Sequence, residues 1–300
     1  MTVPHFELER TPPLAVSTTL HPVPRTERPA ELDTPGLVVL FGHSPNGWKV
    51  TYLLEHLKHR GLIPGYTVVE VQLQGPDGEQ FKPWFKAINP NSKMPVLVHN
   101  RADKPPLAVF ESASILLYLA RTFDRGGQFH FVGADEDDLE QEMLDWCMWQ
   151  MANLGPAQGN ANFWYRYRDE EHQSDFAKER YLTETKRCYK VLDDHLAGKE
   201  YLVGNKLSLA DMCSQPWIRC HFWCGVSLDP YPHVAAWSAR IEQLPVVQAA
   251  LKVPSQDLVT RIRDNPELEG RIMDAMRRRK DEERERKARQ AEGEKVGPSE

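Results

Sequence analysis

Apolar and polar positions alternate differently in the two halves of the chain, which predicts mixed elements first and helices afterwards. The run "LVVLFG" from Leu37 is short and apolar, as expected of a buried strand. The next segment, "NGWKVTYLLEHLKHRG", carries apolar residues at roughly helical spacing and reaches Gly61, a residue that commonly ends a helix. A strand followed by an amphipathic helix is therefore expected from Leu37 to Gly61.

The same reading continues to Asp124. "YTVVEVQL" alternates and is β-branched, so it predicts a strand. "GEQFKPWFKAIN" is a short helical or irregular piece, and "PVLVHN" and "PLAVFE" predict two further strands. "SASILLYLARTF" predicts a helix with Ser112 as its N-cap. The expected order over residues 37–124 is βαβαββα.

Helical periodicity dominates after a polar break, over residues 135–253. Four segments carry it: "DEDDLEQEMLDWCMWQMANLG", "FAKERYLTETKRCYKVLDDHLAG", "SLADMCSQPWIRCHFWCG" and "HVAAWSARIEQLPVVQAAL". In "SLAD", Ser208 can cap a helix while Asp211, three residues on, reaches back as in a capping box. We therefore interpret Asp211 as structural.

The two ends differ from the middle in composition. Residues 1–36 are rich in Pro, Thr and charge and predict an extended N-terminal arm, either disordered or draped over a partner subunit. Residues 254–300 predict a charged C-terminal tail, as a solvated or frayed helix. A nucleic-acid patch is disfavoured there because acidic residues interrupt the arginines.

Composition narrows the class of protein. The 300 residues are 41% hydrophobic and 27% charged, with a formal net charge of -6, so no general attraction to nucleic acid or anionic membrane is indicated. No apolar run suits a membrane span and the start lacks the pattern of a secretory signal, which favours a cytoplasmic location. The five cysteines are odd in number and scattered, as expected of reduced thiols.

Cys220, His221 and Cys224 stand close together on an expected helix. A metal site would need further ligands nearby, and the sequence offers none, so core packing is the favoured interpretation. No metal is expected.

Several motifs together resemble the cytosolic glutathione transferases. These are the βαβαββα unit before a helical domain, "NPNSKMPVL" before the third strand and "FESASILLYLA" after the fourth. "SPNGWK" and "GEQFKPWF" are similar to the Nu-class bacterial enzymes and to the fungal branch that includes the yeast nitrogen-catabolite regulator. Over residues 37–253 the resemblance implies an α+β thioredoxin-like N-terminal domain, an all-α glutathione-transferase C-terminal domain, glutathione as co-substrate and a homodimer.

The junction "FGHSPNGWKV" holds the expected catalytic residues. A helix N-terminus favours an anion such as a thiolate, and the Ser44 hydroxyl and Asn46 amide can donate hydrogen bonds to sulfur. The resemblance places both near the glutathione thiol; simple helix capping is the alternative. The turn has no cysteine, so a mixed disulfide with the protein is not expected, and no tyrosine precedes it.

The resemblance also implies a cis peptide between Met94 and Pro95, which would expose the Met94 backbone to the cysteinyl part of glutathione. An ordinary trans proline at the start of a strand is the alternative. Glu111 suits the γ-glutamyl ammonium group. Ser112, with the helix N-terminus behind it, suits the γ-glutamyl carboxylate.

Gln80 and Lys93 stand where the resembled family has polar or basic groups facing the glycyl end of glutathione. Lys49, inside the first helix, is a further charge that could support the site from behind. Lysines face solvent more often than they support a site, so a solvated Lys49 is the alternative.

A second-substrate pocket is expected between the domains. Asn160, Phe163, Trp164 and Tyr167 can line an apolar wall there, with Arg166 as a charged rim. Aromatic residues at helical spacing also suit a protein core, and that alternative stays open.

The resemblance implies a glutathione-dependent transferase whose bound thiolate attacks a small electrophile or reduces a disulfide. Peroxidase activity is a third possibility, and detoxification and secondary metabolism are both compatible roles. The alternative is a non-enzymatic regulator or protein-binding module that keeps the fold. The yeast regulator's Asn/Gln-rich arm is absent here, because residues 1–36 are rich in Pro and Thr.

Overall fold

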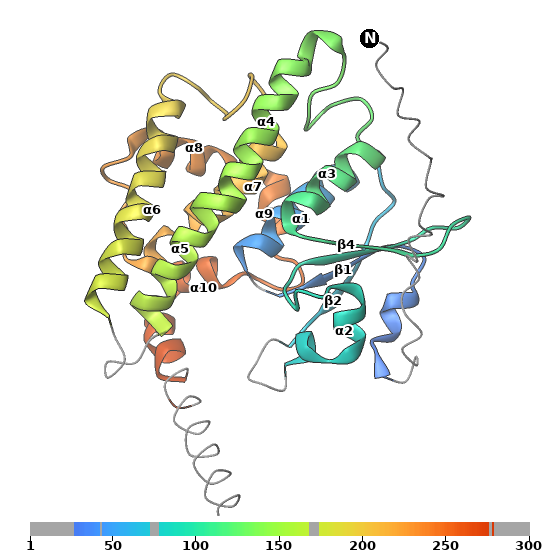
Figure 1. Ribbon diagram of the computed structural model, residues 1–300, viewed down its shortest axis with the longest axis horizontal. Coiled ribbons are helices and arrows are strands. Elements are labelled where there is room, and N and C mark those ends of the chain that lie inside the picture. Colours follow the sequence, from blue (N-terminus) through green and yellow to red (C-terminus); the bar gives the residue numbers. More distant parts are fainter. Residues whose placement is uncertain (1–26, 43, 73–77, 168–173, 276–277, 279–300) are drawn as a thin grey trace, which may run out of the picture.

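A four-stranded mixed sheet organises the N-terminal domain in the computed structural model, which describes residues 27–42, 44–72, 78–167, 174–275 and 278. The strand order is β2-β1-β3-β4, with β2 parallel to β1 and the other two pairs antiparallel (Figure 1). The elements confirm the predicted βαβαββα order: β1 (Gly36–Phe41), α1 (Pro45–His59), β2 (Thr67–Glu70), α2 (Pro83–Ile88), β3 (Val96–Asn100), β4 (Leu107–Phe110) and α3 (Ser112–Phe123).

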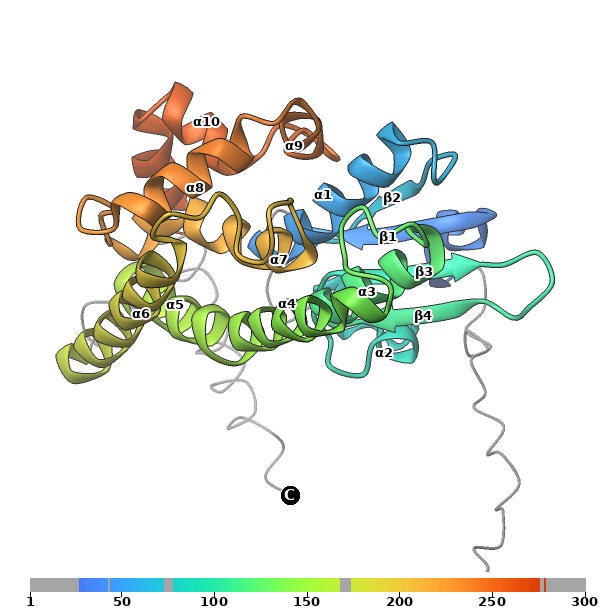
Figure 2. The same ribbon diagram turned by 90° about the horizontal axis from the view of Figure 1, so that it is seen from above.

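Strand β1 is buried on both faces, and its alternation divides the core in two. Leu37, Val39 and Phe41 join the cluster that contains α1, α3 and the helical domain. Val38 and Leu40 point to the other face, where they pack with residues of α2. The sheet is therefore a layer between α2 on one side and α1 with α3 on the other (Figures 1 and 2).

The second domain is helical, as predicted. Its elements are α4 (Asp137–Trp149), π-helices Gln150–Leu154 and Phe163–Tyr167, α5 (Gly155–Asn162), α6 (Asp175–Leu196), α7 (Leu209–Arg219), α8 (Pro232–Glu242), α9 (Pro245–Ala250) and α10 (Leu258–Asp264). Helix α1 packs against α7 and α9, so the first helix of one domain lies on the core of the other (Figure 2).

The capping box predicted at the start of α7 is present. Asp211 Oδ2 accepts from the Ser208 backbone N–H at 2.9 Å. Its Oδ1 accepts from the Leu202 N–H at 2.9 Å and from the Trp237 indole at 2.8 Å. Burial raises the pKa of Asp211 although these hydrogen bonds oppose the shift. The fully buried carboxylate therefore joins three segments, which confirms its structural role.

Both ends contain packed residues that a simple arm or tail would lack. A 3-10 turn spans Ala30–Asp33, and Asn100 Nδ2 donates to the Leu32 carbonyl at 2.8 Å. At the other end, Val259 and Ile262 of α10 are buried. The charge-rich composition of the two ends did not predict these packed segments, because a few apolar residues at the right spacing are enough to attach them. Residues 1–26 and most of 276–300 lie outside the described residues.

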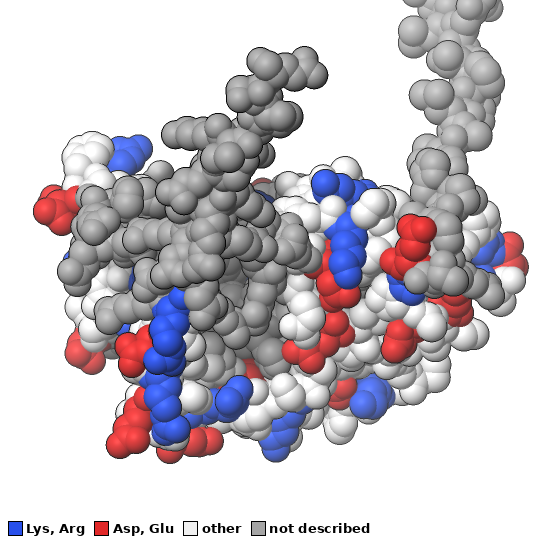
Figure 3. Space-filling model, turned by 90° about the horizontal axis from the view of Figure 1, so that it is seen from below, with Lys and Arg blue, Asp and Glu red and all other residues white. Residues whose placement is uncertain are grey.

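The described surface mixes both signs of charge. In Figure 3, acidic and basic side chains lie next to one another on the face in view. Within the described ranges, no helix is both long and apolar enough to cross a membrane. Across the same residues, no group of three or more His, Cys, Asp or Glu side chains is arranged to hold a metal ion.

Candidate active site

Strand register brings three separate junctions to one end of the sheet. Leu40 of β1 pairs with Val96 of β3, and Val96 pairs with Phe110 of β4. The turn after β1, the residues before β3 and the residues after β4 therefore meet at that end. These are the segments that hold Ser44 with Asn46, Met94 with Pro95, and Glu111 with Ser112.

The first junction is a capped helix N-terminus. Ser44 is the N-cap of α1, and its Oγ accepts from the Gly47 N–H at 3.2 Å. The hydroxyl proton of Ser44 is not used in that contact and stays available to a ligand. A Cβ at Gly47 would lie 2.4 Å from the Phe41 ring, so only glycine lets α1 begin this close to the end of β1. Capping and a role toward a ligand are therefore compatible for Ser44.

Asn46 lies half-buried in the first turn of α1 and reaches the helical domain. Its Oδ1 accepts from the Trp217 indole Nε1–H of α7 at 2.8 Å. The two Nδ2 protons of Asn46 remain on the other side of the amide. The sequence did not predict this contact, because Trp217 is 171 positions away and its pattern indicates a core aromatic residue of its own helix.

The second junction has the expected cis peptide between Met94 and Pro95. Asn89 Nδ2 donates to the Lys93 carbonyl at 2.6 Å and holds the segment before it. Lys93 itself is exposed at this end of the sheet. The Met94 backbone lies just before β3, at the end of the sheet where the third junction also lies.

The third junction combines an unusual backbone with a buried hydroxyl. Glu111 has φ 67°, a conformation that few residues other than glycine adopt, and its side chain is exposed. Asn91 Nδ2 donates to Glu111 Oε1 at 3.3 Å. Ser112 is buried at the first position of α3 and Glu111 is the N-cap, so the prediction of Ser112 as the N-cap is wrong by one residue. The backbone at Glu111 therefore turns a carboxylate outward beside a helix N-terminus.

Lys49 lies behind these junctions as a fully buried side chain, and is not solvated as the alternative proposed. Its Nζ donates to Ser112 Oγ at 3.2 Å and to Gln150 Oε1, and lies 3.4 Å from Met151 Sδ. Burial lowers the pKa of Lys49. Ser112 Oγ accepts from Lys49 and donates its proton to Met151 Sδ at 3.5 Å, so the backbone N–H groups at the start of α3 are the donors left for a ligand.

Gln80 lies in the 3-10 turn Glu79–Phe81 after β2, buried. Since β2 is parallel to β1, the chain leaves both strands at the same end of the sheet. The Val71 N–H donates to the Phe41 carbonyl at 2.9 Å, which ties that exit to the first junction. Residues 73–77, between Val71 and Gln80 in the sequence, lie outside the described residues.

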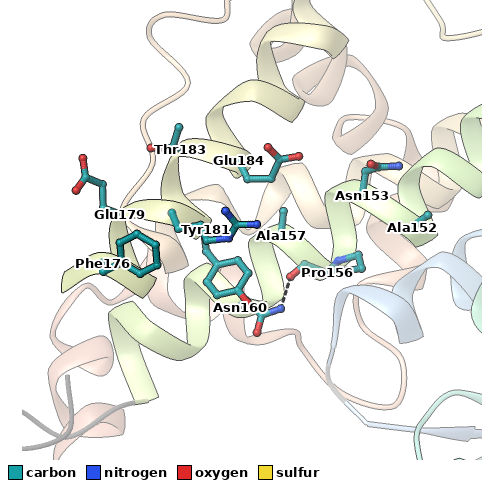
Figure 4. A pocket seen from close by; sticks show the side chains of 11 residues that line it. Ala152, Asn153, Pro156, Ala157, Asn160, Phe176, Glu179, Tyr181, Thr183 and Glu184 are labelled. Carbon is teal, nitrogen blue, oxygen red and sulfur yellow. Dashed lines mark hydrogen bonds between the residues drawn. The ribbon is translucent and has the colours of Figure 1, made fainter. Parts of the chain in front are cut away.

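The residues expected to line a second-substrate wall make contacts of several kinds, and the wall stays a prediction. Asn160 lines a cavity of about 500 Å³ between α5 and α6, where its Nδ2 donates to the Pro156 carbonyl (Figure 4). The Tyr167 hydroxyl accepts from the Trp223 indole at 2.7 Å. Phe163 and Trp164 contact each other edge-on, with ring centroids 5.4 Å apart. Arg166, expected at the rim, donates to the Trp223 carbonyl.

No cysteine is placed to act as an exposed nucleophile, because all five are buried. The Cys213 thiol donates at 3.4 Å to Gln150 Oε1, the same atom that accepts from Lys49. A hydrogen bond with Cys147 and the Lys49 charge lower the pKa of Cys213 to about 7. Its complete burial nevertheless shields this thiol from a substrate.

Comparison with known proteins agrees with this geometry. Models of the glutathione S-transferase N-terminal and C-terminal domains match residues 43–122 and 161–245. The disulfide-bond oxidoreductase YfcG of Escherichia coli strain K12 is 36% identical over 221 residues, which cover 72% of this chain and 95% of YfcG. This chain belongs to the glutathione S-transferase family.

Solved glutathione transferases share the fold. A homologue from Lodderomyces elongisporus, crystallised with two glutathione molecules per subunit, superposes with a TM-score of 0.66 at 28% identity, covering 74% of this chain and 99% of that one. A transferase from Pseudomonas putida, crystallised with one glutathione disulfide per subunit, has a TM-score of 0.63 at 30% identity, covering 73% and 92%. Glutathione, reduced or oxidised, is thus the ligand in both solved relatives.

Proposed function

We propose that this glutathione S-transferase family member is a glutathione-dependent enzyme. It holds the glutathione thiol as a thiolate for attack on a small electrophile or for disulfide reduction. The observation that carries the proposal is the meeting of the three junctions at one end of the sheet. They offer a helix N-terminus, a backbone segment beside a cis proline, and a carboxylate next to a buried hydroxyl.

Each junction suits one part of the tripeptide. The free thiol of glutathione resembles that of cysteine, with a pKa of about 8.5, so it is mostly protonated at neutral pH. Donors from Ser44, Asn46 and the N-terminus of α1 favour the ionised form. Met94 pairs with the cysteinyl backbone, Glu111 binds the γ-glutamyl ammonium and Ser112 binds its carboxylate. Gln80 and Lys93 face the glycyl end.

Disulfide reduction needs no protein thiol. Bound glutathione thiolate attacks one sulfur of the substrate disulfide, forms a mixed disulfide and releases the other sulfur as a thiolate. A second glutathione thiolate attacks the glutathione sulfur of that mixed disulfide, yielding glutathione disulfide and the second substrate thiolate. The relatives named as disulfide-bond oxidoreductases and those holding two glutathiones or glutathione disulfide support this route.

Two substitutions test the assignment in the full chain. Asn46→Ala should lower kcat more than it raises KM for glutathione, because its donors act on the sulfur; equal effects on both would make Asn46 a binding residue. Glu111→Ala should weaken glutathione binding roughly 10- to 150-fold, as expected for a lost hydrogen bond to a charged group. Unchanged binding by calorimetry would remove the γ-glutamyl assignment.

Disulfide reduction and conjugation to an aryl halide should be assayed side by side, with peroxide reduction as a third assay. Turnover in one of them names the reaction class. Tight glutathione binding with no turnover in any assay would favour a regulator or protein-binding module instead.

A homodimer is part of the proposal, as the family resemblance implies. Light scattering coupled to size-exclusion chromatography tests it. The mass of a single chain at working concentrations would refute the dimer without affecting the glutathione site.

A further inference from the structure

The contact between Asn46 and Trp217 joins α1 of the first domain to α7 of the second. The indole Nε1–H of Trp217 donates to Asn46 Oδ1 at 2.8 Å. An indole nitrogen can only donate, whereas an asparagine amide has an acceptor on one side and two donors on the other. The contact therefore selects one of two amide orientations, with Oδ1 toward α7 and the NH₂ group turned away from it.

Trp217 is itself held by the helical domain. Gln158 Nε2 donates to the Trp217 carbonyl at 2.7 Å, and Gln158 Oε1 accepts from the Tyr189 hydroxyl at 3.1 Å. Its indole ring lies along α5, where a Cβ at Gly155 would be 3.7 Å and one at Gly159 would be 3.5 Å from ring atoms. Gln158 and Tyr189 are buried. The Trp217 ring thus packs along α5, and its backbone is held by Gln158, which Tyr189 of α6 holds in turn.

We infer that Trp217 is a positioning residue that keeps the Asn46 amide protons directed at the glutathione sulfur. The inference rests on the proposed function and assigns a task in it to the second domain. With the amide reversed, Oδ1 would face the sulfur and would disfavour the thiolate, while two N–H donors would oppose the indole N–H. The helical domain thereby acts on thiol ionisation through one hydrogen bond.

Two substitutions separate the hydrogen bond from packing. Trp217→Phe keeps an aromatic ring but has no donor. Trp217→His removes more volume, yet superposing the two five-membered rings places its Nε2 where the indole Nε1 was. If the hydrogen bond matters, histidine should preserve function better than phenylalanine. If only packing matters, the smaller imidazole should be the worse replacement.

The thiol pKa of bound glutathione, titrated by the ultraviolet absorbance of the thiolate, is the readout. Trp217→Phe should raise that pKa by about half to one unit, as one hydrogen bond implies, and lower kcat/KM below it ~3- to 10-fold. Activity should recover at alkaline pH, where the thiol ionises unaided. Trp217→His should restore at least half of the shift, and each variant is checked for folding by its urea transition.

A double variant completes the test. In an Asn46→Ala background, Trp217→Phe should cause no further shift, because the amide it positions is gone. Three outcomes would each overturn this inference and leave the proposed function standing. They are an unchanged thiol pKa in Trp217→Phe, a larger shift in Trp217→His than in Trp217→Phe, and an equal shift from Trp217→Phe in the Asn46→Ala background. A wild-type chain that binds no glutathione or leaves its thiol pKa unshifted would overturn the proposed function as well, and only that outcome appears before any substitution is made.

Discussion

Asp257→Ala should destabilise the fold strongly, although Asp257 lies outside the matched family domains. Asp257 is fully buried and caps α10, accepting from the Val259 and Thr260 N–H groups at 2.9 and 3.1 Å. It also accepts two hydrogen bonds from Arg219 of α7, at 2.6 and 3.2 Å. The Arg219 side chain is buried too and additionally contacts Glu242 at 2.9 Å.

The expected loss follows from these contacts. Removing one partner of a buried ion pair costs about 3–5 kcal/mol, because the remaining charge stays buried without its counter-ion. Arg219 keeps Glu242, which favours the lower end of that range, and the lost helix cap costs about 1 kcal/mol more. We expect Asp257→Ala to lower the free energy of unfolding by about 4 kcal/mol, a large share of the typical total.

Urea unfolding at neutral pH measures the loss, with the m value held as a check on two-state behaviour. Asp194→Ala is the matched control, since it breaks the exposed Lys190–Asp194 pair and should cost under about 1 kcal/mol. Arg219→Met combined with Asp257→Ala removes both charges and should recover at least half of the loss.

Acid provides an independent check. Burial acts to raise the pKa of Asp257, but hydrogen bonds and charge from Arg219 outweigh it and lower the pKa below its usual value. The contribution of the carboxylate is therefore present at neutral pH and lost as pH falls through that lowered pKa, so wild type and variant should converge in strong acid. A loss no larger than that of Asp194→Ala, or no recovery in the double variant, would refute the buried pair.

Three further variants test buried ionisable side chains: His56, Lys49 and Asp211. Burial lowers the pKa of His56 to about 4, so the fold should lose stability as pH falls from about 6.5 toward 4. Urea unfolding at pH 7 and at pH 5 measures this loss, and His56→Leu should reduce it by about 2 kcal/mol. An unchanged pH dependence in the variant would contradict this. Lys49→Met should weaken glutathione binding roughly tenfold, about 1.4 kcal/mol by calorimetry, while the exposed Lys58→Met should not; equal affinities would exclude the buried charge from binding. Asp211→Ala should cost about 3–5 kcal/mol because buried donors lose their acceptor, and lost activity at wild-type stability would instead make it catalytic.

Local chemistry made much of the fold predictable. Strand and helix periods, the N-caps at Ser44 and Ser208 and the capping box of Asp211 depend on residues a few positions apart, so the sequence alone reveals them. The βαβαββα order and the helical second half followed in the same way, and the motif around Met94 and Pro95 indicated the cis peptide that the structure contains.

The sequence by itself thus determined the elements, their order and the chemical groups at three junctions. Only the tertiary structure decided that β-strand register gathers those junctions, that Lys49 is buried behind Ser112, and that Trp217 reaches Asn46. It also decided that α10 is part of the packed domain, through Asp257 and Arg219. These contacts join residues 14 to 171 positions apart, and no local pattern encodes which distant side chain fills a given space, because packing of the whole chain selects it.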